Sequence, residues 1–174
     1  LDPNDPQSSF KLSIDDVKTC VPDLNKGATI TVTYIAHLND KAAVNTTSGS
    51  STENKNSVQL QYSNNPRDTE AYWGFTPKSE VCVYTYQLNN TKYHDDDTPG
   101  NELAGAGFRL YSDEACTPEQ EVKLYKKDNF YYPIKDATDK AQDAVEMFSD
   151  EHGQFNVKGL DASTYYLRET KTPD

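Results

Sequence analysis

The sequence predicts an all-β protein made of two tandem immunoglobulin-like β-sandwich domains, and three observations support this prediction. Short segments rich in β-branched and aromatic residues recur along the chain. Turn-forming residues separate these segments at roughly the 8–12-residue spacing of sandwich strands. Helical spacing is hard to find. The chain has 174 residues, and the strand inventory divides it into residues 1–88 and 89–174, each small for a domain.

The first half contains two predicted strands separated by a polar loop. Residues 29–36 are rich in β-branched side chains, and a period of two places Ile30, Val32 and Tyr34 on one face. Residues 58–62 alternate between apolar and polar side chains before a turn at 63–66. The Ser-, Thr- and Asn-rich segment 45–56 is interpreted as an exposed loop.

The segment 81–92 is the most informative predicted strand. Its even positions form the more apolar face, and they are Cys82, Tyr84, Tyr86, Leu88, Asn90 and Lys92. The odd positions from residue 85 onward are polar. Lys92 therefore shares a face with Leu88, although an unpaired ammonium is costly to bury. Either the strand has emerged into solvent at Lys92, or the lysine has a special role.

Two segments that follow suggest ligand sites only superficially. The acidic turn 94–100 lacks the spaced ligands and distal glutamate of a calcium-binding EF-hand loop, so a solvated turn is the simpler interpretation and no metal site is predicted. The glycines of 103–111 do not have the spacing of a phosphate-binding loop, and no helix follows them. A closely packed strand is the better interpretation.

The last third of the chain holds one ambiguous segment and two further strands. Residues 136–148 fit helical spacing, but their end also fits a strand. Strands are predicted at 154–160 and 164–170. In the second of these, Tyr165, Leu167 and Glu169 share a face, so a carboxylate also falls in an apolar register.

Composition and charge exclude several classes of function. The net charge of −11 makes nucleic acid and anionic membranes unfavourable partners, and no apolar run has the length of a membrane-spanning helix. The three histidines occupy dissimilar contexts, and no catalytic or cofactor-binding constellation is visible. The sequence predicts no cofactor and no enzyme with turnover. The alternative is a hydrolase that uses paired carboxylates, because the chain is rich in acidic residues.

Lys92 and Glu169 allow two interpretations. The simpler one is an ion pair that joins two strands. The other is a single self-modification, because an amine in an apolar interior loses its proton readily. A desolvated carboxylic acid beside it can polarise the carbonyl of an asparagine side chain. Attack by the amine would then release ammonia and leave an isopeptide bond.

Several motifs resemble a known family. Residues 103–111 (L-A-G-A-G-F-R-L-Y), 153–160 (G-Q-F-N-V-K-G-L) and 165–173 (Y-Y-L-R-E-T-K-T-P, an E-box) resemble the Cna B-type domain of Gram-positive surface proteins. Residues 32–39, 60–66 and 84–92 resemble the penultimate domain of isopeptide-forming backbone pilins and its bridge into the next domain. The resemblance covers nearly the whole chain.

The resemblance assigns roles in the second domain residue by residue. Lys92 matches the isopeptide lysine on the first strand, and Glu169 matches the acid that promotes the reaction. The acceptor asparagine is expected on a last strand beyond Asp174. Asn90 stands where the family usually has an apolar residue, which predicts a more polar pocket around Lys92.

In the first domain the resemblance implies a second bond. Asn65, or its neighbour Asn64, matches the acceptor position, and the corresponding lysine is expected before residue 1. Asp16, or the adjacent Asp15, is the candidate acid. No pilin-motif lysine and no sorting signal are found, so we expect an internal portion of a longer subunit.

The three cysteines do not indicate whether the protein lies in an oxidising or a reducing compartment. Cys20 and Cys82 could form a disulfide within the first domain, or all three thiols could be free. Cys116 matches a position where some relatives carry a disulfide cysteine. Its partner position is Tyr166 here, so we expect Cys116 to be unpaired.

The resemblance implies a structural subunit of a sortase-assembled pilus, extracellular and anchored to the cell wall. Its partners would be neighbouring pilin subunits, and its only chemistry would be single-turnover self-crosslinking. The alternative is a surface adhesin that binds a host matrix protein or glycan, suggested by the Tyr-rich composition and the polar loop 45–56.

Overall fold

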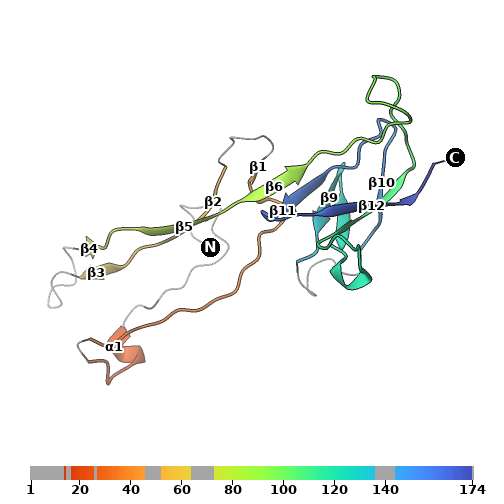
Figure 1. Cartoon of the computed structure of the whole chain (residues 1–174). Helices are drawn as coiled ribbons and strands as arrows, with labels where there is room; N and C mark the ends of the chain where they lie inside the picture. The colour runs from red at the N-terminus through yellow and green to blue at the C-terminus, as the bar shows by residue number, and fades with distance from the viewer. Residues whose placement is uncertain are drawn as a thin grey trace. The chain divides into compact units, whose positions relative to one another are not determined.

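The computed structural model describes residues 14, 17–25, 27–45, 52–63, 73–135 and 144–173. It confirms the all-β prediction: the described helices are α1 (Val17–Cys20) and the 3-10 turn η1 (Pro118–Gln120), and strands form the remaining elements (Figure 1). No helix in these ranges has the length and apolar character to cross a membrane. The chain divides into a first unit, Leu1–Ala36, and a second unit, His37–Asp174.

The first unit does not form its predicted strand. Residues 29–36 have no strand assignment, and the side chains of the predicted apolar face are about half exposed, with Ile30 and Val32 at 53%. An alternating pattern supplies a face for burial, but a strand also needs a hydrogen-bonded neighbour. The described residues of this unit contain no second strand that could serve as that neighbour.

The second unit contains a five-stranded sheet with mixed strand directions. The order across the sheet is β1 (Val44–Asn45), β6 (Thr85–Leu88), β11 (Val157–Leu160), β9 (Phe130–Pro133) and β8 (Leu124–Lys127). β6 and β11 are antiparallel, as are β8 and β9, whereas β1–β6 and β9–β11 are parallel pairs.

A three-stranded antiparallel sheet completes a β-sandwich with it. This sheet has the order β10 (Met147–Phe148), β7 (Gly107–Tyr111) and β12 (Tyr166–Lys171). Phe108 of β7 stacks on Phe155, with ring centroids 4.1 Å apart. Both sheets contribute to one buried core, whose members are Ala106, Phe108, Leu110, Leu124, Tyr131, Met147, Phe155, Val157 and Leu160.

Two antiparallel ribbons extend the second unit. β2 (Asn54–Val58) pairs with β5 (Ser79–Val83), and β3 (Gln61–Ser63) pairs with β4 (Trp73–Phe75). The predicted strand 58–62 is therefore interrupted at 59–60, although a hydrogen bond from the Thr76 amide to the Leu60 carbonyl joins the two ribbons. Large apolar side chains of these ribbons are exposed, among them Val58, Leu60, Val81, Trp73 and Phe75.

The predicted strand 81–92 is divided at Tyr84, and its two faces do not match the sequence pattern. Thr85, at a polar odd position, is fully buried, whereas Tyr84 and Tyr86 on the more apolar face are exposed. The buried hydroxyl of Thr85 is satisfied because it donates to the Ala43 carbonyl at 2.9 Å. Short-range alternation thus fails where one strand leaves a two-stranded ribbon and enters a sandwich.

The polar segment 45–56 is more ordered at its ends than predicted. Asn45 is 4% exposed, and its side chain accepts from the Thr52 amide at 2.9 Å and donates to the Thr85 carbonyl at 3.2 Å. Asn54 begins β2 and bonds both backbone groups of Ala43. Asparagine side chains replace ladder bonds here, which composition alone does not indicate. The middle of this segment, 46–51, lies outside the described residues.

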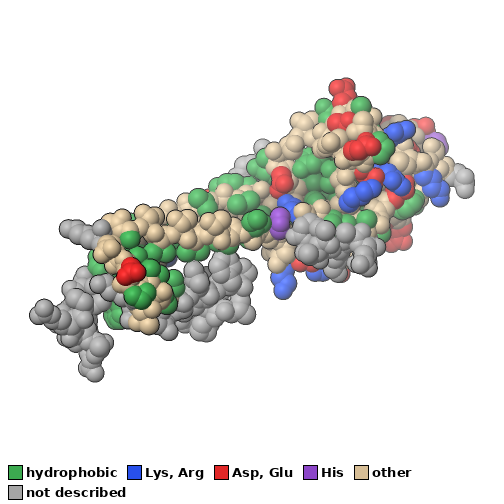
Figure 2. All heavy atoms as spheres, turned by 90° about the horizontal axis from the view of Figure 1, so that it is seen from below, with side chains coloured by type: hydrophobic (Ala, Val, Ile, Leu, Met, Phe, Trp, Pro, Cys, Tyr) green, Lys and Arg blue, Asp and Glu red, His purple; other side chains and the backbone are tan. Residues whose placement is uncertain are grey.

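The ambiguous segment 136–148 ends in the strand β10, and 136–143 lie outside the described residues. Beside β10, Glu146 joins two strands of the three-stranded sheet. Its carboxylate accepts a hydrogen bond from Thr170 of β12 and pairs with Arg109 of β7 at 3.2 Å. The Thr170 bond, together with Arg109, lowers the pKa of Glu146. Figure 2 shows that charged side chains of both signs gather over the sandwich.

We predict that Glu146→Gln lowers stability in a pH-dependent manner. Because the folded-state pKa of Glu146 is lowered, its contribution is fully present above the unfolded pKa, about 4.3, and is lost as pH falls through the folded pKa. Arg109 is 40% exposed, so the loss at pH 7 should be roughly 0.2–1 kcal/mol. Urea unfolding at pH 7 and near pH 3 measures it.

The control is Glu114→Gln, because Glu114 is exposed. The difference between Glu146→Gln and the unsubstituted protein should shrink at the lower pH, while Glu114→Gln should match the unsubstituted protein at both values. A difference for Glu146→Gln that stays constant from pH 7 to pH 3 would contradict the assignment.

Candidate functional site

The structure brings Lys92 and Glu169 together. The Lys92 Nζ lies 3.1 Å from Glu169 Oε2, although the two residues are 77 positions apart in the sequence. Lys92 follows β6, whereas Glu169 lies on β12, where it is the cross-strand partner of Phe108. The ion pair therefore connects the extension of one sheet to a strand of the other.

Backbone hydrogen bonds on both sides hold Lys92. Its amide donates to the Gly153 carbonyl at 2.8 Å, and its carbonyl accepts from the Leu103 amide at 2.9 Å. Thr91 and Gln154 form an antiparallel bridge in the same register as the pair Leu88 and Val157 of β6 and β11. The β6–β11 register thus continues past the end of β6 to Lys92.

Gly153 permits this close approach. Its φ of +70° lies in the left-handed region, and a Cβ added there would lie 2.6 Å from the Lys92 carbonyl oxygen and 3.2 Å from the Leu103 nitrogen. Glycine is the residue that adopts this conformation without steric cost. The position of the Lys92 backbone therefore depends on the absence of a side chain at residue 153.

Glu169 lies on a strand with an open side. In the three-stranded sheet β7 is central, and β12 pairs with β7 on one side only among the described residues. Leu167, which shares a face with Glu169, is 41% exposed. The unpaired side of such a strand can accept another strand.

The Lys92–Glu169 pair is partly exposed to solvent. The side chain of Lys92 is 27% exposed and that of Glu169 is 34% exposed, so water reaches both groups. Among the described residues, Glu169 is the polar partner of the Lys92 amine. In this state the two groups form a half-exposed ion pair, the simpler of the two interpretations. The isopeptide chemistry also needs a carboxamide as third partner.

The other predicted site residues cannot be placed beside this pair. Asn64, Asn65, Asp15 and Asp16 lie outside the described residues. Asn90 is partly buried, and its side chain bonds the Phe155 carbonyl.

All three cysteines carry free thiols in the structure. Cys20 is exposed in the first unit, whereas Cys82 and Cys116 are partly buried in the second. The Cys82 thiol donates to Glu53 at 3.3 Å, which raises the pKa of Cys82 and lowers that of Glu53. Because Cys20 and Cys82 belong to different units, their pairing stays a prediction.

The acidic turn 94–100 is organised by its own hydrogen bonds. Asp96 Oδ1 accepts from the Thr98 amide at 3.0 Å and from the Asn101 side chain at 2.8 Å. Bonds from Thr98 and Asn101 lower the pKa of Asp96. No group of three or more His, Cys, Asp or Glu side chains in the described part of the chain could hold a metal ion.

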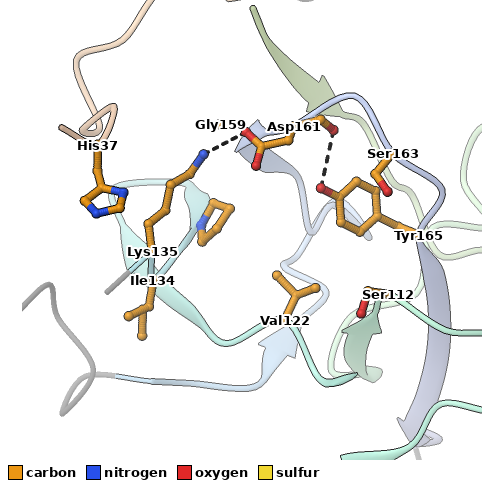
Figure 3. A pocket seen from close by; sticks show the side chains of 10 residues that line it. His37, Ser112, Val122, Ile134, Lys135, Gly159, Asp161, Ser163 and Tyr165 are labelled. Atoms are coloured by element: carbon orange, nitrogen blue, oxygen red, sulfur yellow. Dashed lines mark hydrogen bonds and ion pairs between the residues drawn. The ribbon is translucent and has the colours of Figure 1, made fainter. Parts of the chain in front are cut away.

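Sequence reasoning missed a pocket of about 560 Å³ in the second unit. Lys135 and Asp161 form an ion pair of 2.9 Å at its wall, and the Tyr165 hydroxyl donates to the Asp161 carbonyl at 3.3 Å (Figure 3). Burial raises the pKa of Tyr165. The residues that line the pocket are scattered through the sequence from 37 to 165, so no local motif could have indicated it.

Comparisons with known proteins bear on the second unit in particular. The family model described as "SpaA: Prealbumin-like fold domain" matches residues 86–174, just over half of the chain. A search of curated proteins found no match. Among solved structures, a 35 kDa C-terminal fragment of the major pilin GBS80 of Streptococcus agalactiae is 24% identical, with a TM-score of 0.46. The match covers 70% of this chain but 41% of that one.

We predict that Gly153→Ala disturbs the Lys92 segment specifically. The left-handed backbone alone should cost about 1–2 kcal/mol for a non-glycine residue, and the contact with the Lys92 carbonyl adds to that cost. Hydrogen exchange at the Leu103 amide, which bonds that carbonyl, should accelerate.

Gly100→Ala is the matched control, because Gly100 also has a positive φ, +102°, but a Cβ there would meet no atom within 4 Å. If the two variants lose equal stability and leave Leu103 exchange equal, the close approach at Gly153 has no consequence for Lys92.

Proposed function

The chain belongs to the SpaA prealbumin-like fold family, and from this premise we propose that it is a structural subunit of a sortase-assembled pilus. Lys92 and Glu169 would take part in an autocatalytic isopeptide bond that stabilises the second domain. The observation that carries this proposal is the 3.1 Å contact between Lys92 Nζ and Glu169 Oε2. Two residues singled out by independent sequence motifs form that contact.

The proposed reaction joins Lys92 to an asparagine side chain. The neutral Lys92 amine attacks the carboxamide carbon, while Glu169 in its acid form donates a hydrogen bond to the carbonyl oxygen. The amine then loses its proton, the carbon–nitrogen bond of the carboxamide breaks, and ammonia leaves with that proton. One amide replaces another, so no oxidant, reductant or cofactor is needed.

A further strand would supply what the half-exposed pair lacks. We propose that the acceptor asparagine follows residue 174 in the subunit, on a strand that pairs with the open side of β12. Such a strand would cover the exposed parts of Lys92 and Glu169. Removal from water favours the neutral amine and the protonated acid, which are the forms that the reaction needs.

The finer organisation of the subunit belongs to the same proposal. Residues 1–88 and 89–174 would form two tandem domains, and Asn65 or Asn64, with Asp16 as acid, would serve a second bond in the first domain. The subunit would be extracellular, anchored to the cell wall and joined to neighbouring subunits by sortase. The motif resemblance and the family membership of residues 86–174 support this organisation.

The proposed bond has a mechanical purpose. Pulling force on a pilus enters a domain through its first strand and leaves through its last, so a covalent link between them carries the load directly. Such a link also restricts the unfolded chain, as a disulfide does. For a closed loop of about 80 residues, that effect is worth roughly 4–5 kcal/mol.

The test is intact-mass measurement of the subunit released from the cell surface. Each isopeptide bond should lower the mass by about 17 Da, the mass of the ammonia that leaves. A branched peptide containing Lys92 should appear in the digest, and Glu169→Gln should restore the mass for that bond. An unshifted mass together with an unmodified Lys92 peptide would refute the proposal.

A further inference from the structure

The antiparallel ladder that leads to Lys92 is irregular at Asn90. The register of β6 and β11 places Asn90 opposite Phe155, and the Phe155 amide donates to the Asn90 carbonyl at 3.2 Å as expected. The reciprocal bond is absent from this described pair. Instead the Asn90 amide donates to Asn156 Oδ1 at 2.8 Å, and Asn90 Nδ2 donates to the Phe155 carbonyl at 3.1 Å.

Two side chains therefore replace one backbone bond. The missing bond would have joined the Asn90 amide to the Phe155 carbonyl. Each of these two groups is instead bonded to the side-chain amide of an asparagine. This arrangement fits one alignment of the two segments, since a shift by one residue would remove both asparagine contacts. The alignment of the two segments must be fixed here, because a shift by one residue turns Lys92 to the opposite face of the strand.

Asn156 is itself anchored in the five-stranded sheet. Its carbonyl accepts from the Tyr131 amide of β9 at 2.9 Å, and its neighbours Phe155 and Val157 belong to the buried core. Asn90 is separated from Lys92 by one residue, so their side chains leave the strand on the same side. The hydrogen bonds of Asn90 and Asn156 thus link the position of Lys92 to that of the core.

We propose that Asn90 and Asn156 are positioning residues that hold Lys92 in register with Glu169. This inference rests on the proposed function, because it assigns the asparagine pair a purpose in the Lys92–Glu169 chemistry. The side-chain amide of Asn90 thereby supports the ladder that leads to Lys92.

Two isosteric substitutions have different expected outcomes for the Lys92 position. Asn90→Asp replaces the donor Nδ2 by an oxygen that faces the Phe155 carbonyl, so the contact becomes repulsive. Asn156→Asp keeps an acceptor oxygen for the Asn90 amide and loses only the 3.3 Å bond from Asn156 Nδ2 to Gln154. Both substitutions add one negative charge, and a negative charge near an amine favours its protonated, unreactive form. A rise in Lys92 labelling after Asn90→Asp therefore cannot come from charge alone.

The measurement is acetylation of individual lysines of the chain by a limiting amount of an amine-reactive ester, read by peptide mass spectrometry. Labelling of Lys92 is expressed relative to exposed Lys41 in the same molecules. Asn90→Asp should raise this ratio by about two- to fivefold, which corresponds to loss of a partly exposed ion pair. Asn156→Asp should leave the ratio unchanged.

Labelling of Lys135 reports whether the sandwich stays folded, because that side chain is 19% exposed and pairs with Asp161. If Asn90→Asp raises Lys135 labelling as well, Asn156→Leu, which removes the acceptor, replaces it with the same expectation for Lys92. An unchanged Lys92 ratio in the folded variant, or equal ratios for Asn90→Asp and Asn156→Asp, would overturn the inference.

Glu169→Gln separates this inference from the proposed function. If Glu169→Gln raises the Lys92 ratio while Asn90→Asp does not, the Lys–Glu pair stands and the positioning role fails. If Glu169→Gln has no effect, the ion pair does not restrain Lys92 and the proposed function loses its main support.

Discussion

The antiparallel pairing of the β6 extension with residues 153–157 is the constraint on which the rest of the site depends. Phe155 and Val157 are fixed by the core, and each hydrogen bond between the two segments carries that position further, as far as Lys92. β12 is fixed separately, through its pairing with β7. The distance between lysine and glutamate is therefore a property of the whole sandwich and not of either strand alone.

This dependence explains why the pairing of Lys92 with Glu169 could be predicted from sequence. The strands β7, β11 and β12 lie within the motifs 103–111, 153–160 and 165–173, and the family match to residues 86–174 confirms the resemblance on which their prediction rested. Each motif fixes a strand and its register, and together they fix where the two charged side chains lie. The half-exposure of the pair could not be predicted in the same way, since it depends on what covers β12.

The first half of the chain was predicted less well for a physical reason. Residues 29–36 have a strong alternating pattern but no strand, because pairing needs a neighbour that a pattern does not provide. Thr85 and Asn45 are buried against the expectation from polarity. Both are satisfied by contacts with residues distant in the sequence, and a single sequence does not specify such contacts.

The charges along β12 have a further consequence. Arg168, Glu169 and Lys171 occupy half of this six-residue strand, and charged side chains on the open side of an edge strand oppose indiscriminate association between molecules. An uncharged, aggregation-prone segment that docked there would remove these charged side chains from water without giving them partners. A strand whose own charges complement this sequence would meet no such penalty, so the same residues that keep the protein dispersed also discriminate among incoming strands.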